Sequence, residues 1–317
     1  MVFTRTLRGA LVGLSLLAAL TACQRDTEMS AEAKAAQARA EAAFLQDQQA
    51  WRKQRVEALT QPDGWTSLIG LHWLDNGVRR VGSGRDNGIQ LMQGPAHLGL
   101  FTVKKDRVSF TADTALTLDG QPARGGVLRS DADPMGASVI AFDEGKGLAV
   151  VIKRGGRLAL RVRHADAESR LRFTGLNYWP GGRDWQMPAR FIAHPPGTTL
   201  PIVNIIGVTD NVPNPGKVEF QRDGKLYHLE ALDEGGATLL LVFADRTSGH
   251  GSYGAGRFLD VPKPDTKGHL RIDFNQAYNP PCAFTPFATC PLPPPENRLD
   301  LRVEAGEKDY IKPTKES

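Results

Sequence analysis

The chain has 317 residues, of which 41% are hydrophobic and 23% are charged, and its formal net charge is +4. This is a globular composition, which excludes wholesale disorder, and three cysteines are too few for a disulfide-rich scaffold. Lysine and arginine are scattered without a stripe of interleaved aromatic residues, so the sequence predicts no nucleic-acid partner.

The N-terminal segment has the pattern of a secretory signal. Arg5 and Arg8 precede an apolar run over residues 10–20, which is too short to cross roughly 30 Å of hydrocarbon as a helix. The run ends in the sequence LTAC, which resembles the bacterial lipobox with Cys23 as the lipid-receiving cysteine. We therefore expect a signal peptide over residues 1–22 and a lipid on Cys23. An ordinary signal peptide cut nearby, with an incidental cysteine, is the alternative.

The residues that follow Cys23 predict where the protein lies. Residues 23–30 are polar and are expected to form a short tether. Gln24 directly follows Cys23, at the position where an aspartate would resemble an inner-membrane retention signal. No later apolar run approaches the length of about 18 residues that a spanning helix needs. The sequence thus predicts an envelope protein whose membrane contact is the lipid anchor, on the periplasmic face of the outer membrane.

Residues 31–62 predict a long helix. Ala, Glu, Gln, Lys and Arg dominate this segment, and all of them are strong helix formers. Apolar residues recur only in its second half, at Phe44, Leu45, Trp51, Val56 and Leu59. We therefore expect the first half of the helix to be solvated and the second half to pack on the body of the protein.

The rest of the chain predicts a mainly β fold. Short runs that alternate apolar and polar residues, as in residues 158–163, recur between glycine, aspartate and proline. There is no fixed repeat and no alternation of helix and strand, which argues against a nucleotide-binding α/β fold. We expect two antiparallel sandwich-like or barrel-like halves, over residues 63–176 and 177–317.

The first half is faintly similar to a forkhead-associated sandwich. The turn at Gly84 and Arg85, the imidazole of His97 and the pair Asp119-Gly120 fall where that family keeps comparable residues. The serine that the family keeps before its histidine is missing, and Asp119 stands in place of an asparagine. The resemblance therefore bears on the fold and not on phosphopeptide binding.

The C-terminal half carries the most specific pattern. Residues 243–261 read FADRTSGHGSYGAGRFLDV, residues 273–299 read DFNQAYNPPCAFTPFATCPLPPPENRL, and residues 304–310 read EAGEKDY. These blocks closely resemble the bacterial domain of unknown function family 1684, and residues 51–55 and 64–74 extend the resemblance toward the N-terminus. The resemblance implies a mainly β fold and a candidate site, but no reaction.

A dense set of polar residues lies within these blocks. Its members are Asp245, Arg257, Asp273, Asn275, Tyr278 and Asn279. Polar side chains at strand ends and in loops can converge on one pocket. Arg257 with Asp245 could hold a ligand carboxylate or phosphate, or the two could pair with each other as a structural knot, and both interpretations remain open.

Cys282 and Cys290 are separated by seven residues. In an oxidising periplasm this spacing predicts first a disulfide that closes the loop between them. The alternative is a thiolate nucleophile at Cys282, for which His250 and His269 are the nearest histidines. No metal site or cofactor is predicted, because CxxC is absent and the histidines show no ligand spacing.

These features leave two main hypotheses for the function. The first is a non-catalytic envelope lipoprotein that binds a small anionic or sugar-like ligand, or a protein partner, in a pocket of the C-terminal β domain. The second is a hydrolase or lyase, with Asp245 or Asp273 as general base and Arg257 as anion clamp. A purely structural lipoprotein is a third possibility, if the polar set is wholly buried.

Overall fold

The structure is a computed structural model that describes residues 31–313. The predicted signal peptide, Cys23 and the tether lie outside the described residues. The described chain divides into two compact units, of which the first runs up to Asp47 and the second begins at Gln48. The first unit holds the N-terminal part of one helix, and every other described element belongs to the second unit.

Helix α1 spans Ala31–Leu59 and crosses from the first unit into the second. It ends before the predicted limit at residue 62 because Pro62 has no backbone N–H to continue the hydrogen-bond ladder. The hydroxyl of Thr66 donates to the Leu59 carbonyl oxygen at 2.6 Å and satisfies one of the free carbonyls of the last turn. Of the predicted apolar stripe, Leu59 is only 1% exposed, whereas Leu45 is 50% exposed and does not belong to a packed face.

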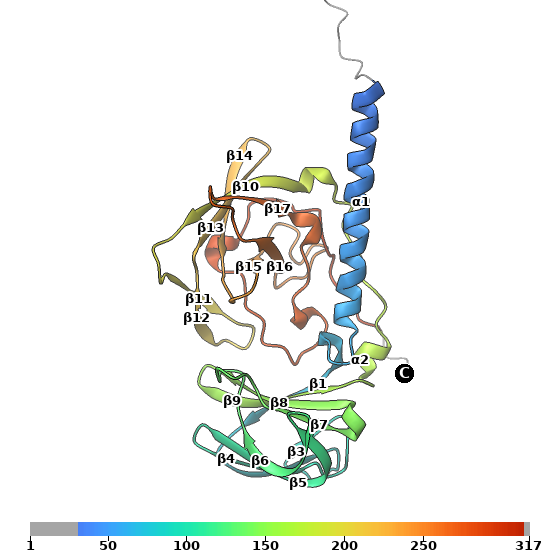
Figure 1. Cartoon of the computed structure of the whole chain (residues 1–317), viewed down its shortest axis with the longest axis vertical. Coiled ribbons are helices and arrows are strands. Elements are labelled where there is room, and N and C mark those ends of the chain that lie inside the picture. The colour runs from blue at the N-terminus through green and yellow to red at the C-terminus, as the bar shows by residue number, and fades with distance from the viewer. Residues whose placement is uncertain (1–30, 314–317) are drawn as a thin grey trace, which may run out of the picture. The chain divides into compact units, whose positions relative to one another are not determined.

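The first β half is a nine-stranded sheet that curls into a nearly closed barrel (Figure 1). The strand order is β1-β9-β8-β7-β5-β4-β2-β3, with β6 paired to β5, and only the short β2–β3 pair is parallel. The strands are β1 Leu68–Leu74, β2 Gly77–Gly82, β3 Ile89–Gln90, β4 Gly99–Lys104, β5 Arg107–Leu118, β6 Gln121–Leu128, β7 Val139–Phe142, β8 Gly147–Arg154 and β9 Arg157–His164. Short helical turns flank them: η1 Trp65–Ser67, η2 Asp143–Gly145 and α2 Glu168–Leu171.

Strand β9 shows how the sequence pattern fixes the faces of this sheet. Leu158, Leu160 and Val162 belong to the barrel core and are between 0% and 5% exposed. Because side chains alternate along a strand, Arg161 and Arg163 lie on the other face. The same alternation that builds the barrel core therefore sets two arginines side by side outside it.

The second β half contains a four-stranded antiparallel sheet, in the order β14-β13-β10-β17, and two hairpins, β11–β12 and β15–β16. The strands are β10 Gln186–Ala193, β11 Thr199–Val203, β12 Thr209–Pro213, β13 Gly216–Arg222, β14 Lys225–Ala231, β15 Thr238–Phe243, β16 Arg257–Pro262 and β17 His269–Asp273. Four short 3-10 turns complete it: η3 Arg183–Trp185, η4 Phe274–Gln276, η5 Pro281–Ala283 and η6 Pro295–Asn297.

The core of the second half is built on aromatic rings. The ring of Phe274 meets the rings of Phe220 and Phe243 edge-on, with centroids 5.3 and 5.5 Å away. Val303 and Ala305, which follow the last strand, are fully buried in the same core. The C-terminal segment is therefore packed on the sheet and contributes its polar neighbours to the interior.

The predicted fold class is confirmed. After the N-terminal helix the described chain is mainly antiparallel β, and the first half takes the barrel-like form of the two that the sequence allowed. Among residues 31–313, no helix is both long and apolar enough to cross a membrane.

Candidate functional site

Arg257 and Asp245 form a closed knot inside the second β half. Arg257 is 1% exposed, and its Nη2 atom donates to Asp245 Oδ2 at 2.9 Å and to the Val303 carbonyl oxygen at 2.9 Å. Its Nη1 atom donates to the carbonyl oxygen of Ala305. The guanidinium group thus pins the C-terminal segment to strand β16.

The Asp245 carboxylate is equally occupied. Its Oδ1 atom accepts from the Thr247 backbone N–H at 2.9 Å and from the Thr247 hydroxyl at 2.6 Å, and its Oδ2 atom also accepts from the Val303 N–H at 2.9 Å. With these donors, the oxygens of the Asp245 carboxylate are occupied and have no free position for a substrate proton. Of the two interpretations that the sequence left open, the geometry is that of a structural knot, in which Arg257 and Asp245 pair with each other.

Asp273 and Asn275 form a second knot, with different partners. Asp273 Oδ2 accepts from the side-chain amides of Gln48 and Gln186 at 2.9 and 3.0 Å, and its Oδ1 atom accepts from the backbone and side-chain N–H groups of Asn275. Asn275 in turn exchanges two hydrogen bonds of 2.9 Å with the backbone of Gly182. The knot ties helix α1 and the turn before β10 to the end of β17.

Asn279 belongs to a third group, centred on buried Glu307. The Glu307 carboxylate is fully buried, and it accepts from the Asn279 backbone N–H and from Arg55 Nε, each at 2.8 Å. Arg55 Nη2 also donates to the Asn279 carbonyl oxygen at 2.8 Å. The guanidinium carbon of Arg55 lies 4.6 Å from the ring centroid of Tyr278. Arg55 therefore links helix α1 to the C-terminal segment.

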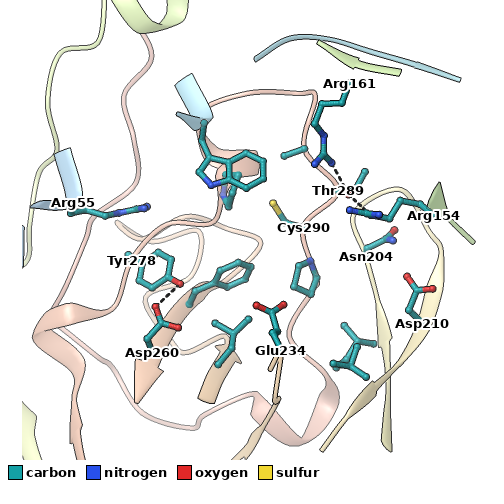
Figure 2. A pocket seen from close by; sticks show the side chains of 18 of the residues that line it. Arg55, Arg154, Arg161, Asn204, Asp210, Glu234, Asp260, Tyr278, Thr289 and Cys290 are labelled. Atoms are coloured by element: carbon teal, nitrogen blue, oxygen red, sulfur yellow. Dashed lines mark hydrogen bonds between the residues drawn. The ribbon is translucent and has the colours of Figure 1, made fainter. Parts of the chain in front are cut away.

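Of the predicted polar set, only Tyr278 lines a cavity that lies between helix α1, the barrel and the second β half, within the second unit. This cavity has a volume of about 670 Å³ and is open to solvent (Figure 2). Helix α1, the barrel and the second β half all contribute to its wall. The lining residues are Trp51, Gln54, Arg55, Trp65, Arg154, Arg161, Ile202, Asn204, Asp210, Val212, Glu234, Leu240, Phe258, Asp260, Tyr278, Pro281, Ala288, Thr289, Cys290 and Pro291.

One side of the cavity is cationic. Arg161 from β9 and Arg154 from β8 point to the same hydroxyl, Thr289 Oγ1, each at 3.3 Å (Figure 2). Arg154 also forms an ion pair of 2.7 Å with Asp131. Asn204 stands beside them, and its side-chain amide donor has no partner among the described residues, while its oxygen holds two backbone N–H groups.

Arg161 is a buried cation without a carboxylate partner in the described part of the chain. It is 7% exposed, and its Nε atom is buried with no hydrogen-bond partner. Burial, together with repulsion from Arg154 and Arg163, lowers the pKa of Arg161 to about 10. The group therefore remains charged at neutral pH but in an environment that disfavours the charge.

The other side of the cavity is acidic. Asp260 on β16 accepts a hydrogen bond of 3.0 Å from the Tyr278 hydroxyl, and Glu234 lies nearby across the lining (Figure 2). Partial burial raises the pKa of Glu234, and the charge of Asp260 raises it further. Partial burial also raises the pKa of Asp260, against the opposing effects of the Tyr278 hydrogen bond and the charge of Arg55.

The sequence reasoning passed over most residues of this cavity. It used residues 158–163 only as evidence for a strand, although their alternation sets Arg161 and Arg163 on the non-core face. The available signal for this side of the cavity was the pair of arginines on the strand face opposite the apolar core face. The sequence contains no comparable signal for Glu234 or Asp260, because each is a single acidic residue in an ordinary turn or strand.

The two C-terminal cysteines are close together and are free thiols in the structure. The Cys282 backbone N–H donates to Cys290 Sγ at 3.1 Å, and the Cys290 N–H donates to Cys282 Sγ at 3.3 Å. The hydrogen bond between the thiols lowers the pKa of Cys282 and raises that of Cys290. The predicted disulfide is thus not formed here, and it stays a prediction for the protein in an oxidising compartment.

No metal-binding cluster of three or more His, Cys, Asp or Glu side chains occurs in the part of the chain that the structure describes.

Comparisons with known proteins find similarity to a family and to a solved structure. Residues 171–308 match the family described as "Protein of unknown function (DUF1684)". The resemblance at residues 51–55 and 64–74 lies outside that match. The chain is also similar to an uncharacterized protein of Haloarcula marismortui with a solution NMR structure, at 31% identity over 44% of this chain and 78% of that chain. The TM-score is 0.37, and no curated protein matches.

The knot at Arg257 generates a stability prediction. Arg257→Met leaves the Asp245 carboxylate buried without its cation, and we expect this to cost about 3–5 kcal/mol of the free energy of unfolding. Arg246→Met is the matched control, because Arg246 pairs with Asp300 at a site where both side chains are more than 60% exposed. Thermal unfolding of both variants measures the difference. Equal melting temperatures would contradict the structural role of Arg257.

The cysteine pair generates a second prediction. We expect the 282–290 peptide from protein recovered from an oxidising compartment to resist alkylation under denaturing conditions until a reductant is added. Mass spectrometry of that peptide gives the result independently of Cys23. Two alkylated cysteines before reduction would rule out the disulfide, and a Cys290→Ser variant provides the marker for a single free Cys282.

Proposed function

We propose that this chain, which carries the DUF1684 segment at residues 171–308, binds a small anionic ligand in the cavity that Arg161 lines. The carrying observation is the charge of Arg161, which is more than nine-tenths buried and has no carboxylate partner among the described residues. Removing an ion from water costs several kcal/mol unless an opposite charge compensates it. A bound carboxylate or phosphate would supply that compensation.

The donors around Arg161 support an anion rather than a neutral guest. The Arg161 Nε group and the free side-chain amide of Asn204 are unpartnered, and Thr289 holds both arginines in one place. Arginine donors match carboxylate and phosphate oxygens in geometry as well as in charge. Because Arg154 is already paired with Asp131, Arg161 carries most of the uncompensated charge.

The size and walls of the cavity support a small molecule. A volume of about 670 Å³ lies within the usual range of small-molecule sites. Trp51, Trp65, Phe258 and Tyr278 contribute aromatic wall on which the apolar part of a ligand, or a sugar ring, can lie. A protein partner would instead be expected to use a broad exposed surface.

A hydrolase or lyase remains the alternative, and one observation favours it. Glu234 and Asp260 are carboxylates with raised pKa values beside an anion-binding group, which is the arrangement that acid–base catalysis uses. Asp245 and Asp273, the bases that the sequence favoured, are engaged in structural knots and do not line the cavity. An enzyme of this kind would therefore work through Glu234 or Asp260.

We further propose that the protein is anchored by a lipid on Cys23 at the periplasmic face of the outer membrane. The lipobox-like sequence LTAC, the short apolar run before it and the residue Gln24 after it support this proposal. The anchor and the tether would leave the body of the protein, with its cavity, in the periplasm.

The ligand proposal makes a prediction about Arg161. Arg161→Met keeps the apolar stem but removes the charge, so we expect the affinity for inorganic phosphate, measured by isothermal titration calorimetry, to fall at least about tenfold. Because the variant also removes an uncompensated buried charge, it should unfold at a temperature no lower than that of the unmodified protein.

Arg163→Met is the matched control for Arg161→Met. Arg163 lies two residues along the same strand and also stacks near Trp65, with its guanidinium carbon 5.5 Å from the ring centroid, but it does not line the cavity. We expect it to leave phosphate affinity unchanged. The proposal fails if Arg161→Met binds phosphate as tightly as the unmodified protein, or if both variants lose binding equally.

The anchor makes a separate prediction. In cells fed labelled palmitate, we expect the full-length chain to be labelled and to sediment with membranes, and Cys23→Ser to lose both properties. Label retained by Cys23→Ser would contradict the assignment of Cys23. Gln24→Asp is expected to keep the label and to move the protein to the inner-membrane fraction.

A further inference from the structure

The cavity carries opposite charges on its two sides, and they do not pair with each other. Figure 2 shows Arg161 and Arg154 at one side, with Glu234 and Asp260 well separated from them at the other. None of the ion pairs in the described residues joins the two sides, and Arg161 and Glu234 have no ion-pair partner within residues 31–313. A cavity with a buried, unpaired cation on one side and solvent-facing, unpaired carboxylates on the other fits a ligand that has both signs.

The acidic side also has free positions, although its two carboxylates face solvent, whereas Arg161 is buried. Glu234 has no hydrogen-bond or ion-pair partner among the described residues, and Asp260 has the Tyr278 hydroxyl alone. The raised pKa of each carboxyl group reflects partial burial, and Glu234 is also affected by the charge of Asp260. A cation placed between them would relieve the repulsion and favour the ionised forms.

The cation that faces this pair in the protein is already engaged. Arg55 is near enough to lower the pKa of Asp260, but its guanidinium group bonds to the Glu307 carboxylate and to the Asn279 carbonyl oxygen. Arg55 also lies over one face of the Tyr278 ring. It therefore serves to hold helix α1 to the C-terminal segment, and the acidic pair keeps room for a cation from outside.

From this arrangement we infer that the ligand is a small zwitterion, in which an ammonium group binds Glu234 and Asp260 while a carboxylate or phosphate binds Arg161. The inference rests on the proposed anion site and adds the second recognition element. A purely anionic ligand would meet the repulsion of the two carboxylates, whereas an ammonium group gains charge-assisted hydrogen bonds from them. The aromatic ring of Phe258, which lines the same cavity, adds a surface that ammonium groups favour.

The test uses ligands that differ only in the amine. A series of ω-amino acids from glycine to 6-aminohexanoate is titrated against the full chain by calorimetry, each beside its N-acetyl form, which keeps the carboxylate and loses the cation. We expect at least one amino acid of suitable length to bind about tenfold or more tightly than its N-acetyl form, since charged hydrogen bonds each contribute about 1.5–3 kcal/mol.

Variants assign the preference to the acidic side. Glu234→Gln should remove most of the amine preference and leave the affinity for the N-acetyl form unchanged or higher. Asp233→Asn is the matched control, because Asp233 is the neighbouring acid, pairs with Lys263 at 3.1 Å and does not line this cavity. It should leave the preference unchanged. Arg161→Met should weaken the binding of both forms.

The pH provides a second readout of the same residues. Asp260 and Glu234, with raised pKa values, must be ionised to hold an ammonium group, and the charged or titratable groups around them in the cavity are Arg55, Asp210 and the neutral Tyr278 hydroxyl. We therefore expect the ratio of the two affinities to fall as the pH is lowered from neutral, as the carboxylates take up protons, and the fall should begin at a higher pH than for ordinary carboxyl groups. The Glu234→Gln variant should show a smaller pH effect.

The outcomes separate this inference from the proposed function. Equal affinities for an amino acid and its N-acetyl form across the series would overturn the zwitterion while leaving the anion site intact. Binding of calcium that Glu234→Gln abolishes, with no amine preference, would also overturn it, by showing that the acidic pair serves a metal ion. Failure of Arg161→Met to weaken any ligand, or of the unmodified chain to bind phosphate, would instead overturn the proposed function.

Discussion

The uncompensated charge of Arg161 is the constraint on which the account of this molecule depends. Two other deeply buried charges of the described chain do meet opposite charges: Arg257 has Asp245, and Glu307 has Arg55. Arg161 is almost as deeply buried as these groups, yet it points to a solvent-open cavity and holds only a threonine hydroxyl. Because a buried charge without a partner destabilises the fold, a ligand that brings the opposite charge to Arg161 would stabilise the protein.

The polar knots explain how the cavity keeps its shape. Arg257 and Asp245 fix the C-terminal segment on the second β half, while Gln48 and Arg55 tie the end of helix α1 to Asp273 and Glu307. These contacts join segments far apart in the sequence through several hydrogen bonds each. They hold the helix, the barrel strands and the C-terminal loops at the positions from which Trp51, Arg161 and Tyr278 reach the cavity.

The sequence predicted the fold class and the long helix because both depend on local patterns. The helix composition of residues 31–62 and the period-two alternation of residues 158–163 are properties of neighbouring residues, which packing then preserves. The candidate site was harder to predict, since a dense polar block can be a ligand site or a structural knot. Only the hydrogen-bond partners of the polar residues distinguish a ligand site from a knot, and those of Arg257 lie at residues 245 and 303–307. Arg161 and Glu234 meet at one cavity solely through the tertiary fold.

The most direct measurement is an NMR titration of the arginine side-chain Nε–Hε resonances of the full chain with inorganic phosphate. The guanidinium group of Arg161 lines the cavity, so its Nε–Hε resonance should shift when an anion binds that group. The Arg257 resonance serves as the internal reference, because its guanidinium group is enclosed in the knot with Asp245. A shift confined to Arg161 and Arg154 is the result that we predict. An unchanged Arg161 resonance at saturating phosphate would contradict the claim that this arginine is the anion site.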